Sequence, residues 1–198
     1  PGAIRRWYAM AMPADTHPTF PDHPAAWTLE EVLALPEDQG SRIELVDGTV
    51  VVSPHPASKH QRILRWILLA WNDAIPPGCE LFPGVNVVLN SGQLLIPDLV
   101  VVTEADVDTG YYKGTEVLMA VEIHSPSTRA YDRAFKRQLY ADAGVPFLVF
   151  VDPATDPVSA VCYELDGGEY RESTHSDNGV LTFTDPFAAT VDLARSGH

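Results

Sequence analysis

One segment in the second half of the chain constrains the fold most, because it has the pattern of a strand, a helix and a second strand. Residues 117–123 are apolar apart from one glutamate, which is typical of a strand buried on both faces. A helix is predicted over about 128–143, closed by Gly144 with Pro146 beyond it. The apolar run 147–151 predicts the second strand. Such a unit favours a right-handed crossover between parallel strands.

The rest of the chain supplies more strands than helices. A short helix begins at Thr28 with a capping-box pattern, and a longer one is predicted over 58–74, apolar on most sides and therefore in the core. Asp47-Gly48 is a strong local signal for a hairpin. Further strands are predicted at 43–53, 79–89 (with an interruption at Pro83-Gly84), 94–103, 158–164 and 169–172. This order predicts an α/β (α+β) fold with a mixed central β-sheet flanked by helices.

The length of 198 residues fits one domain, which we place at residues 25–195. Residues 1–24 contain four prolines in their second half and are predicted to form an extended arm. Because Pro1 cannot be an initiator, we expect the start of the chain to be trimmed or derived from cloning. Residues 196–198, Ser-Gly-His, resemble the remnant of a histidine tag.

The sequence also indicates a cellular compartment. No apolar run approaches the ~20 residues that a membrane-spanning helix needs, so we expect no membrane association. Cys79 and Cys162 show no C-x-x-C or Cys/His spacing, which argues against a disulfide framework or a zinc knuckle. Two unpaired thiols suit a reducing environment, and we expect a cytoplasmic protein.

Three acidic residues interrupt or adjoin apolar strand sequences, and they are the first candidates for function. Glu44 lies in Ile-Glu-Leu-Val, Asp98 in Ile-Pro-Asp-Leu-Val, and Glu122 in Ala-Val-Glu-Ile. A carboxylate inside an apolar strand is costly unless it is paired, hydrogen-bonded or bound to a metal. If these side chains converge, they form a site for a hard cation such as Mg²⁺ or Mn²⁺.

The predicted helix that follows Glu122 carries a lysine that can return to this carboxylate. Because side chains alternate along a strand, Glu122 and His124 point to the same face. Asp132, Lys136 and Tyr140 are four residues apart and share one stripe of the helix. Since the helix leaves the end of the strand that holds Glu122, this stripe can bring Lys136 toward the acid.

These residues, taken in order, resemble the Uma2 family of the PD-(D/E)xK nuclease superfamily. The matching segments are Ile96-Pro97-Asp98, Val121-Glu122-Ile123-His124-Ser125-Pro126-Ser127-Thr128, Asp132…Lys136…Tyr140, Gly144-Val145, Val151-Asp152-Pro153, and upstream Glu44-Leu45-Val46-Asp47-Gly48 and Ser53-Pro54…His60. The similarity covers roughly residues 27–195. It implies a restriction-endonuclease-like fold, so that 25–195 would be a single nuclease-like domain.

The resemblance also implies a role for each matched position. Asp98 would be the aspartate of the PD motif, Glu122 the second acid and Glu44 an additional acid, all three as catalytic metal ligands. His124 stands where the superfamily usually has its lysine, so Lys136 would be the migrated catalytic lysine. The implied activity is Mg²⁺- or Mn²⁺-dependent endonucleolytic hydrolysis of phosphodiester bonds. The implied partners are nucleic acid, in the first place DNA, and a second copy of the chain in a homodimer.

Each candidate has a structural interpretation as well. Asp98 could be a turn carboxylate that caps backbone donors, and Glu122 could be half of an ion pair with an arginine. Lys136 could pair with Asp132 on an exposed helix face, and Glu44 could lie on the solvent face of a hairpin. The alternative function is then a catalytically inactive, nuclease-like binding or regulatory protein. A zinc site is a third alternative without a short ligand pair to support it, built from His55, His60 and His124.

The charge of the chain bears on all of these functions. With 13 Lys+Arg against 27 Asp+Glu, the net charge of −14 argues against non-specific phosphate binding. Seven basic residues nevertheless fall on two predicted helices, namely Lys59, Arg62, Arg65, Arg129, Arg133, Lys136 and Arg137. The sequence therefore predicts weak, salt-sensitive binding of nucleic acid through one basic patch.

Overall fold

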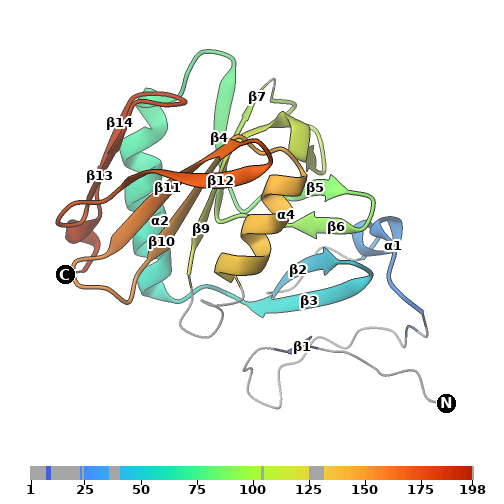
Figure 1. Ribbon diagram of the computed structural model, residues 1–198. Helices are drawn as coiled ribbons and strands as arrows, with labels where there is room; N and C mark the ends of the chain where they lie inside the picture. Colours follow the sequence, from blue (N-terminus) through green and yellow to red (C-terminus); the bar gives the residue numbers. More distant parts are fainter. Residues whose placement is uncertain are drawn as a thin grey trace.

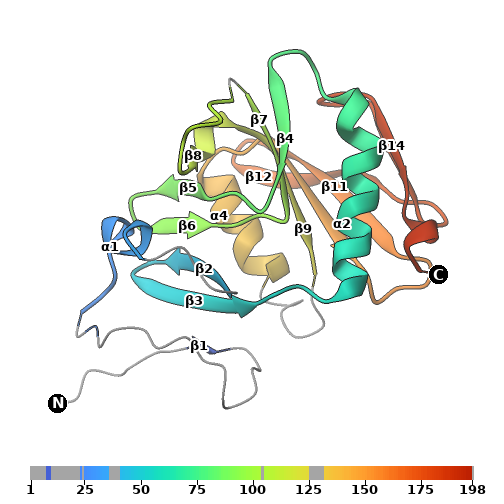
Figure 2. The ribbon, with the colours of Figure 1, turned by 180° about the vertical axis from the view of Figure 1, so that it is seen from behind.

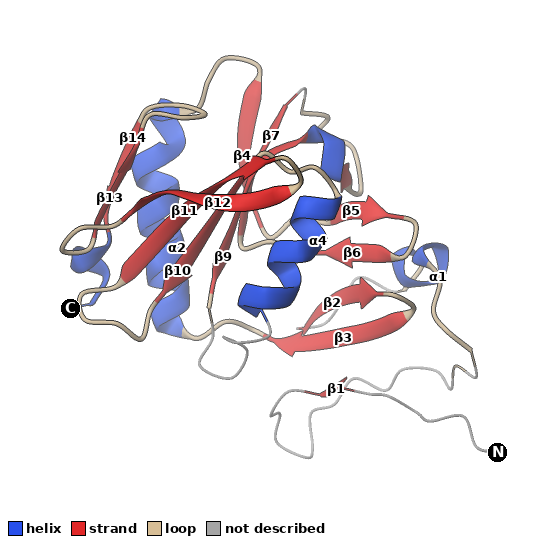
Figure 3. Cartoon of the chain, in the orientation of Figure 1, coloured by secondary structure: helices blue, strands red, loops and turns tan. Residues whose placement is uncertain are grey.

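The computed structural model describes residues 8–9, 23, 25–35, 41–103, 105–124 and 132–197. In this part of the chain, strands form two six-stranded sheets and one two-stranded sheet (Figures 1 and 3). The predicted α+β class with mixed sheets is confirmed, although the strands are divided between two sheets. Apart from residues 8–9 and 23, the predicted arm lies outside the described residues, as does His198 at the other end.

The first sheet has the strand order β1-β3-β2-β6-β5-β8. Its strands are β1 Tyr8–Ala9, β2 Ser41–Val46, β3 Thr49–Pro54, β5 Val87–Asn90, β6 Gln93–Leu95 and β8 Tyr112–Lys113. The predicted hairpin is confirmed, because Asp47 and Gly48 turn between β2 and β3 with φ angles of 47° and 77°. A Cβ on Gly48 would lie 2.6 Å from the Cβ of Ala26, so only glycine fits this turn.

The second sheet has the strand order β12-β11-β10-β9-β7-β4. Its strands are β4 Cys79–Pro83, β7 Leu99–Thr103, β9 Val117–Ile123, β10 Phe147–Asp152, β11 Ser159–Asp166 and β12 Glu169–His175. As predicted, β9 and β10 pair in parallel, with Met119 opposite Phe147 and Ile123 opposite Val151. The other pairings in this sheet are antiparallel. β9 therefore lies inside the sheet, between β10 and β7.

Two helices and a small third sheet cover the second sheet, and a short helix packs against the first sheet. The helices are α1 Leu29–Leu33, α2 Ser58–Trp71 and α4 Arg137–Asp142, and the third sheet joins β13 Val180–Phe183 to β14 Ala189–Asp192. Short turns of other helix types are η1 Asn72–Ala74, η2 Gly114–Glu116, η3 Asp132–Lys136 and η4 Leu193–Gly197, of which η3 is a π-helical turn that continues into α4. None of the described helices combines the length and the apolar character needed to cross a membrane.

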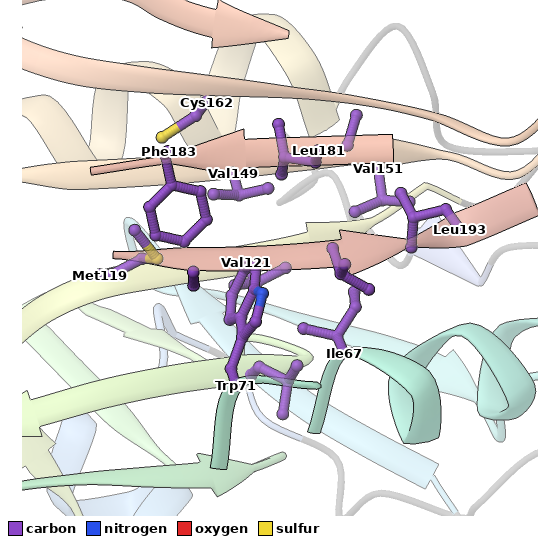
Figure 4. Close-up of a cluster of buried hydrophobic side chains, with 14 of the residues drawn as sticks. Ile67, Trp71, Met119, Val121, Val149, Val151, Cys162, Leu181, Phe183 and Leu193 are labelled. Carbon is purple, nitrogen blue, oxygen red and sulfur yellow. The ribbon is translucent and has the colours of Figure 1, made fainter. Parts of the chain in front are cut away.

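α2 and α4 pack on opposite faces of the second sheet (Figures 1 and 2). Ile67 and Trp71 of α2 join Val121 in an apolar cluster, and the ring of Phe183 in β13 packs edge-on against Trp71 with 5.2 Å between the ring centres (Figure 4). The prediction that this helix is apolar on most sides is wrong, and the prediction that it lies in the core holds for only part of its surface. Only one stripe of α2 is buried, and Leu69 keeps 65% of its surface exposed.

Two predicted strands are each broken where the chain passes from one sheet to the other. The expected strand 79–89 divides at Gly84 into β4 and β5, and the expected strand 94–103 divides at Pro97-Asp98 into β6 and β7. The two breaks lie together, because the amide of Gly84 donates to the carbonyl of Asp98 at 3.2 Å. Asp98 is therefore at the junction between the two sheets.

Candidate active site

Four charged side chains predicted from the sequence meet at this junction. Glu44 comes from β2 in the first sheet, and Glu122 comes from β9 in the second sheet. Asp98 lies in the link that precedes β7, and Lys136 is the last residue of the π-helical turn before α4. All four are buried. Because sequence-distant elements supply them, their meeting depends on how the two sheets are joined.

Lys136 links the two glutamates. Its Nζ donates to Glu44 Oε1 at 3.0 Å and to Glu122 Oε1 and Oε2 at 3.0 and 3.2 Å. The amide of Ile96 donates to Glu44 Oε1 at 3.0 Å and fixes that carboxylate from the first sheet. Glu44 is therefore not on the solvent face of its hairpin, and Lys136 is not on an exposed helix face. Both structural interpretations of these residues are wrong.

Glu122 is held by a second partner on the same helical segment. The hydroxyl of Tyr140, in α4, donates to Glu122 Oε1 at 2.7 Å. Burial raises the pKa of Glu122 to about 7, and the charges of Asp98 and Glu44 add to this rise while Lys136 opposes it. Burial also raises the pKa of Tyr140 well above its ordinary value, so its hydroxyl remains a donor. The predicted stripe of Lys136 and Tyr140 does face the carboxylate.

Asp98 is bound by residues from three different elements. Arg42 Nη1 of β2 lies 2.5 Å from Oδ1, His60 Nε2 of α2 lies 3.0 Å from the same oxygen, and the amide of Ile123 donates to Oδ2 at 2.7 Å. Burial favours the neutral acid, but the His60 ring, the Arg42 charge and this amide outweigh burial and lower the pKa of Asp98. Asp98 is therefore ionised at neutral pH.

Arg42 is the site residue that the sequence prediction missed. It lies two residues before Glu44 in β2, so both side chains emerge on the same face of the strand. This spacing is the one sequence signal that could have placed an arginine beside the carboxylates.

His124 takes a place in the core next to the site. It is buried, its amide donates to the carbonyl of Val151 at 2.9 Å, and its ring lies 4.8 Å from that of Phe150.

The histidines of the zinc alternative do not lie together. His55 is exposed, whereas His60 contacts Asp98. Among the residues that the structure describes, no three His, Cys, Asp or Glu side chains gather as a ready set of metal ligands, which applies to the three carboxylates as well as to the histidines of the zinc alternative.

A model of the Uma2 family, whose description is "Putative restriction endonuclease", matches residues 29–195. The chain belongs to the Uma2 family. Among solved structures, it is similar to "a putative nuclease belonging to DUF820" from Anabaena variabilis, with a TM-score of 0.63 and 19% sequence identity, covering 81% of this chain and 89% of that chain. At this identity the likeness shows a shared fold. The search of curated proteins gave no match.

The donor chemistry of this Uma2 site suits a divalent cation. Asp98, Glu122 and Glu44 offer only carboxylate oxygens, the ligands that Mg²⁺ and Mn²⁺ prefer. In this structure Lys136 forms ion pairs with Glu44 and Glu122, and Arg42 forms one with Asp98. The ligand types thus fit a hard cation, whereas the present arrangement is one of internal ion pairs.

The predicted basic patch of the Uma2 chain is smaller than the sequence suggested. Lys136 is buried among the acids, and the guanidinium of Arg137 lies 4.6 Å from the centre of the Tyr163 ring and donates to the carbonyl of Tyr170. Arg62 and Arg65 are exposed on α2. Residue 129 and the side chain of residue 133 lie outside the described structure.

Proposed function

We propose that this Uma2 protein is a metal-dependent endonuclease that hydrolyses phosphodiester bonds of nucleic acid, with DNA as the first substrate to test. The observation that carries the proposal is the buried convergence of Asp98, Glu122 and Lys136 where the two sheets join. Membership of a family described as "Putative restriction endonuclease" supports the same reaction class.

Asp98 and Glu122 would hold the Mg²⁺ or Mn²⁺ ion, with Glu44 as the third carboxylate. When bound, such an ion polarises the scissile phosphate and lowers the pKa of bound water. Lys136 Nζ, within 3.0 Å of both glutamates, would orient the attacking water or stabilise charge that develops on the phosphate. Tyr140 and the amide of Ile123 keep Glu122 and Asp98 in position.

Cleavage of supercoiled plasmid with Mn²⁺, and with EDTA as the blank, tests the proposal. We expect the wild-type protein to cut only with the metal, Asp98→Asn to lose activity, and Lys136→Met to lose roughly 10²–10³-fold. Arg171→Ala is the matched control, because the Arg171 side chain is 74% exposed and pairs only with Asp166 in the described structure. Equal cleavage by all four proteins would point to a contaminating nuclease and refute the assignment.

The second candidate function is a non-catalytic, nuclease-like binding or regulatory protein. The observation in its favour is that all three carboxylates are already engaged in ion pairs with Lys136 or Arg42. Thermal unfolding separates the two functions, because a ligand that binds only the folded state raises the melting temperature. A rise with Mn²⁺ that Glu122→Gln abolishes supports the metal enzyme, whereas unchanged melting at millimolar Mn²⁺ supports the inactive protein.

We also propose a homodimer as the form that cuts duplex DNA. One chain supplies one set of Asp98, Glu122 and Lys136, whereas a duplex has two strands to cleave. Light scattering during size-exclusion chromatography measures the mass directly. A monomeric mass with nicked circles as the only plasmid product would contradict the proposal.

A further inference from the structure

Two basic side chains contact the buried carboxylates, and they differ in access to solvent. The side chain of Lys136 is 11% exposed and is bound to two glutamates, whereas the side chain of Arg42 is 24% exposed and pairs with Asp98. A phosphodiester that approaches three carboxylates on a chain of net charge −14 is repelled unless a cation faces it. Arg42 is the more exposed of these two cations.

The contact with Asp98 occupies one arm of the Arg42 guanidinium. Nη1 is 2.5 Å from Asp98 Oδ1, and the other arm, Nη2, lies beside Gly84. Gly84 has no side chain to cover that arm, and Nη2 is 3.7 Å from the place where a Cβ would stand. A guanidinium carries five N–H donors in a planar fork, so one edge can bind a carboxylate while another binds a phosphate.

We propose that Arg42 binds a phosphate group of the nucleic-acid substrate while it holds Asp98 in place. This inference rests on the proposed nuclease function and adds a substrate-binding residue to it. β2 supports the arrangement, because it delivers Arg42 and Glu44 to the same face two residues apart. A single strand thus supplies both an acid of the site and the cation that receives the substrate.

Binding of a fluorescently labelled DNA duplex, measured by anisotropy at several salt concentrations, tests the inference. The measurements use EDTA and, separately, Ca²⁺, which accepts the same oxygen ligands as Mg²⁺ in a looser geometry. We expect Arg42→Gln to weaken binding about tenfold or more and to reduce the slope of log K against log salt concentration by about 1. Arg171→Ala, with its exposed side chain, is expected to bind as the wild type does.

Arg42→Lys is a second variant, which tests the same inference if Arg42→Gln fails to fold. It keeps a positive charge to pair with Asp98 but lacks the second nitrogen, so we expect near-wild-type melting and several-fold weaker binding. Folded Arg42→Gln and Arg42→Lys proteins that bind with wild-type affinity and salt slope would overturn the inference, even if their cleavage is impaired. If the wild-type protein cuts DNA with Mn²⁺ in that case, the proposed function survives. A wild-type protein that neither binds nor cuts refutes both.

Discussion

The two faces of β9 are built differently although they belong to one strand. Met119, Val121 and Ile123 enter the apolar cluster that α2 covers (Figure 4). On the other face, Ala120 packs beneath α4, and two positions further along Glu122 meets Lys136 and Tyr140. The strand thus contributes stability on one face and a polar site on the other. The site begins where the apolar packing of the second face ends.

The difference in construction sets how each face responds to substitution. On the α2 face, a truncated side chain loses transfer free energy and leaves a cavity, so the loss scales with the volume removed. On the α4 face, removing one partner leaves a buried charge without compensation, and the loss exceeds what the size of the group would suggest. The following substitutions test this contrast.

The largest effect is expected for Lys136→Met, a replacement of similar length. It leaves Glu44 and Glu122 buried without their shared cation, and we expect a loss of about 3–5 kcal/mol in the free energy of unfolding at pH 8. Urea denaturation measures it. Lys113→Met is the control, because Lys113 is exposed and its loss is expected to stay within about 0.5 kcal/mol. Similar losses for the two variants would contradict the contrast.

Tyr140→Phe is expected to have a smaller effect on the same face. The change removes the hydroxyl that donates to Glu122 Oε1 at 2.7 Å and keeps the ring that packs under the sheet. We expect a loss of about 1–3 kcal/mol. A double-mutant cycle with Glu122→Gln shows whether the loss belongs to this hydrogen bond, since the two changes should then not add. Full additivity would assign the loss to packing instead.

On the α2 face, Ile67→Val tests packing alone. Ile67 is fully buried against the second sheet, and removal of one methylene is expected to cost about 0.5–1.5 kcal/mol. Because no charged partner is involved, Mn²⁺-dependent cleavage should remain at the wild-type level where the protein is folded. A loss of cleavage without a loss of stability would show that the two faces are coupled.

The sequence predicts this site better than it predicts the sheets. The alternation of β9, the crossover to β10 and the spacing of Lys136 and Tyr140 are local patterns, and together they place a lysine against Glu122. The passage between sheets at Gly84 and Asp98 is not local. Neither the interruption at Pro83-Gly84 nor the apolar run around Asp98 reveals which strand will be the neighbour. The pairing of Arg42 with Asp98, 56 residues away, is equally non-local, although the spacing of two residues between Arg42 and Glu44 was a local signal for its place in the site.

The smallest effect on stability is expected at an ion pair on the surface. Comparing this pair with Lys136 and its glutamates shows how much the contrast between the two faces of β9 depends on burial. His23 Nε2 lies 3.1 Å from Glu31 Oε1 on α1, in contact with solvent. The Ala25 carbonyl and Glu31 raise the pKa of His23, while the Thr28 amide, His23 and the Thr28 hydroxyl lower the pKa of Glu31 to about 2. The contribution of His23 is therefore complete below its ordinary pKa of 6.5 and is lost as the pH rises through the raised value.

Glu31→Gln should lower the pKa of His23 only part of the way toward 6.5, because the Ala25 carbonyl remains as its acceptor at 2.8 Å. An NMR titration of the His23 ring measures this change, and Glu30→Gln, one residue earlier on the exposed side of α1, is the control. The melting temperature should stay unchanged in both variants, because solvent screens an exposed pair. A drop in melting as large as that of Tyr140→Phe would show that charge pairing stabilises this protein without burial, and the contrast between the faces of β9 would lose its explanation.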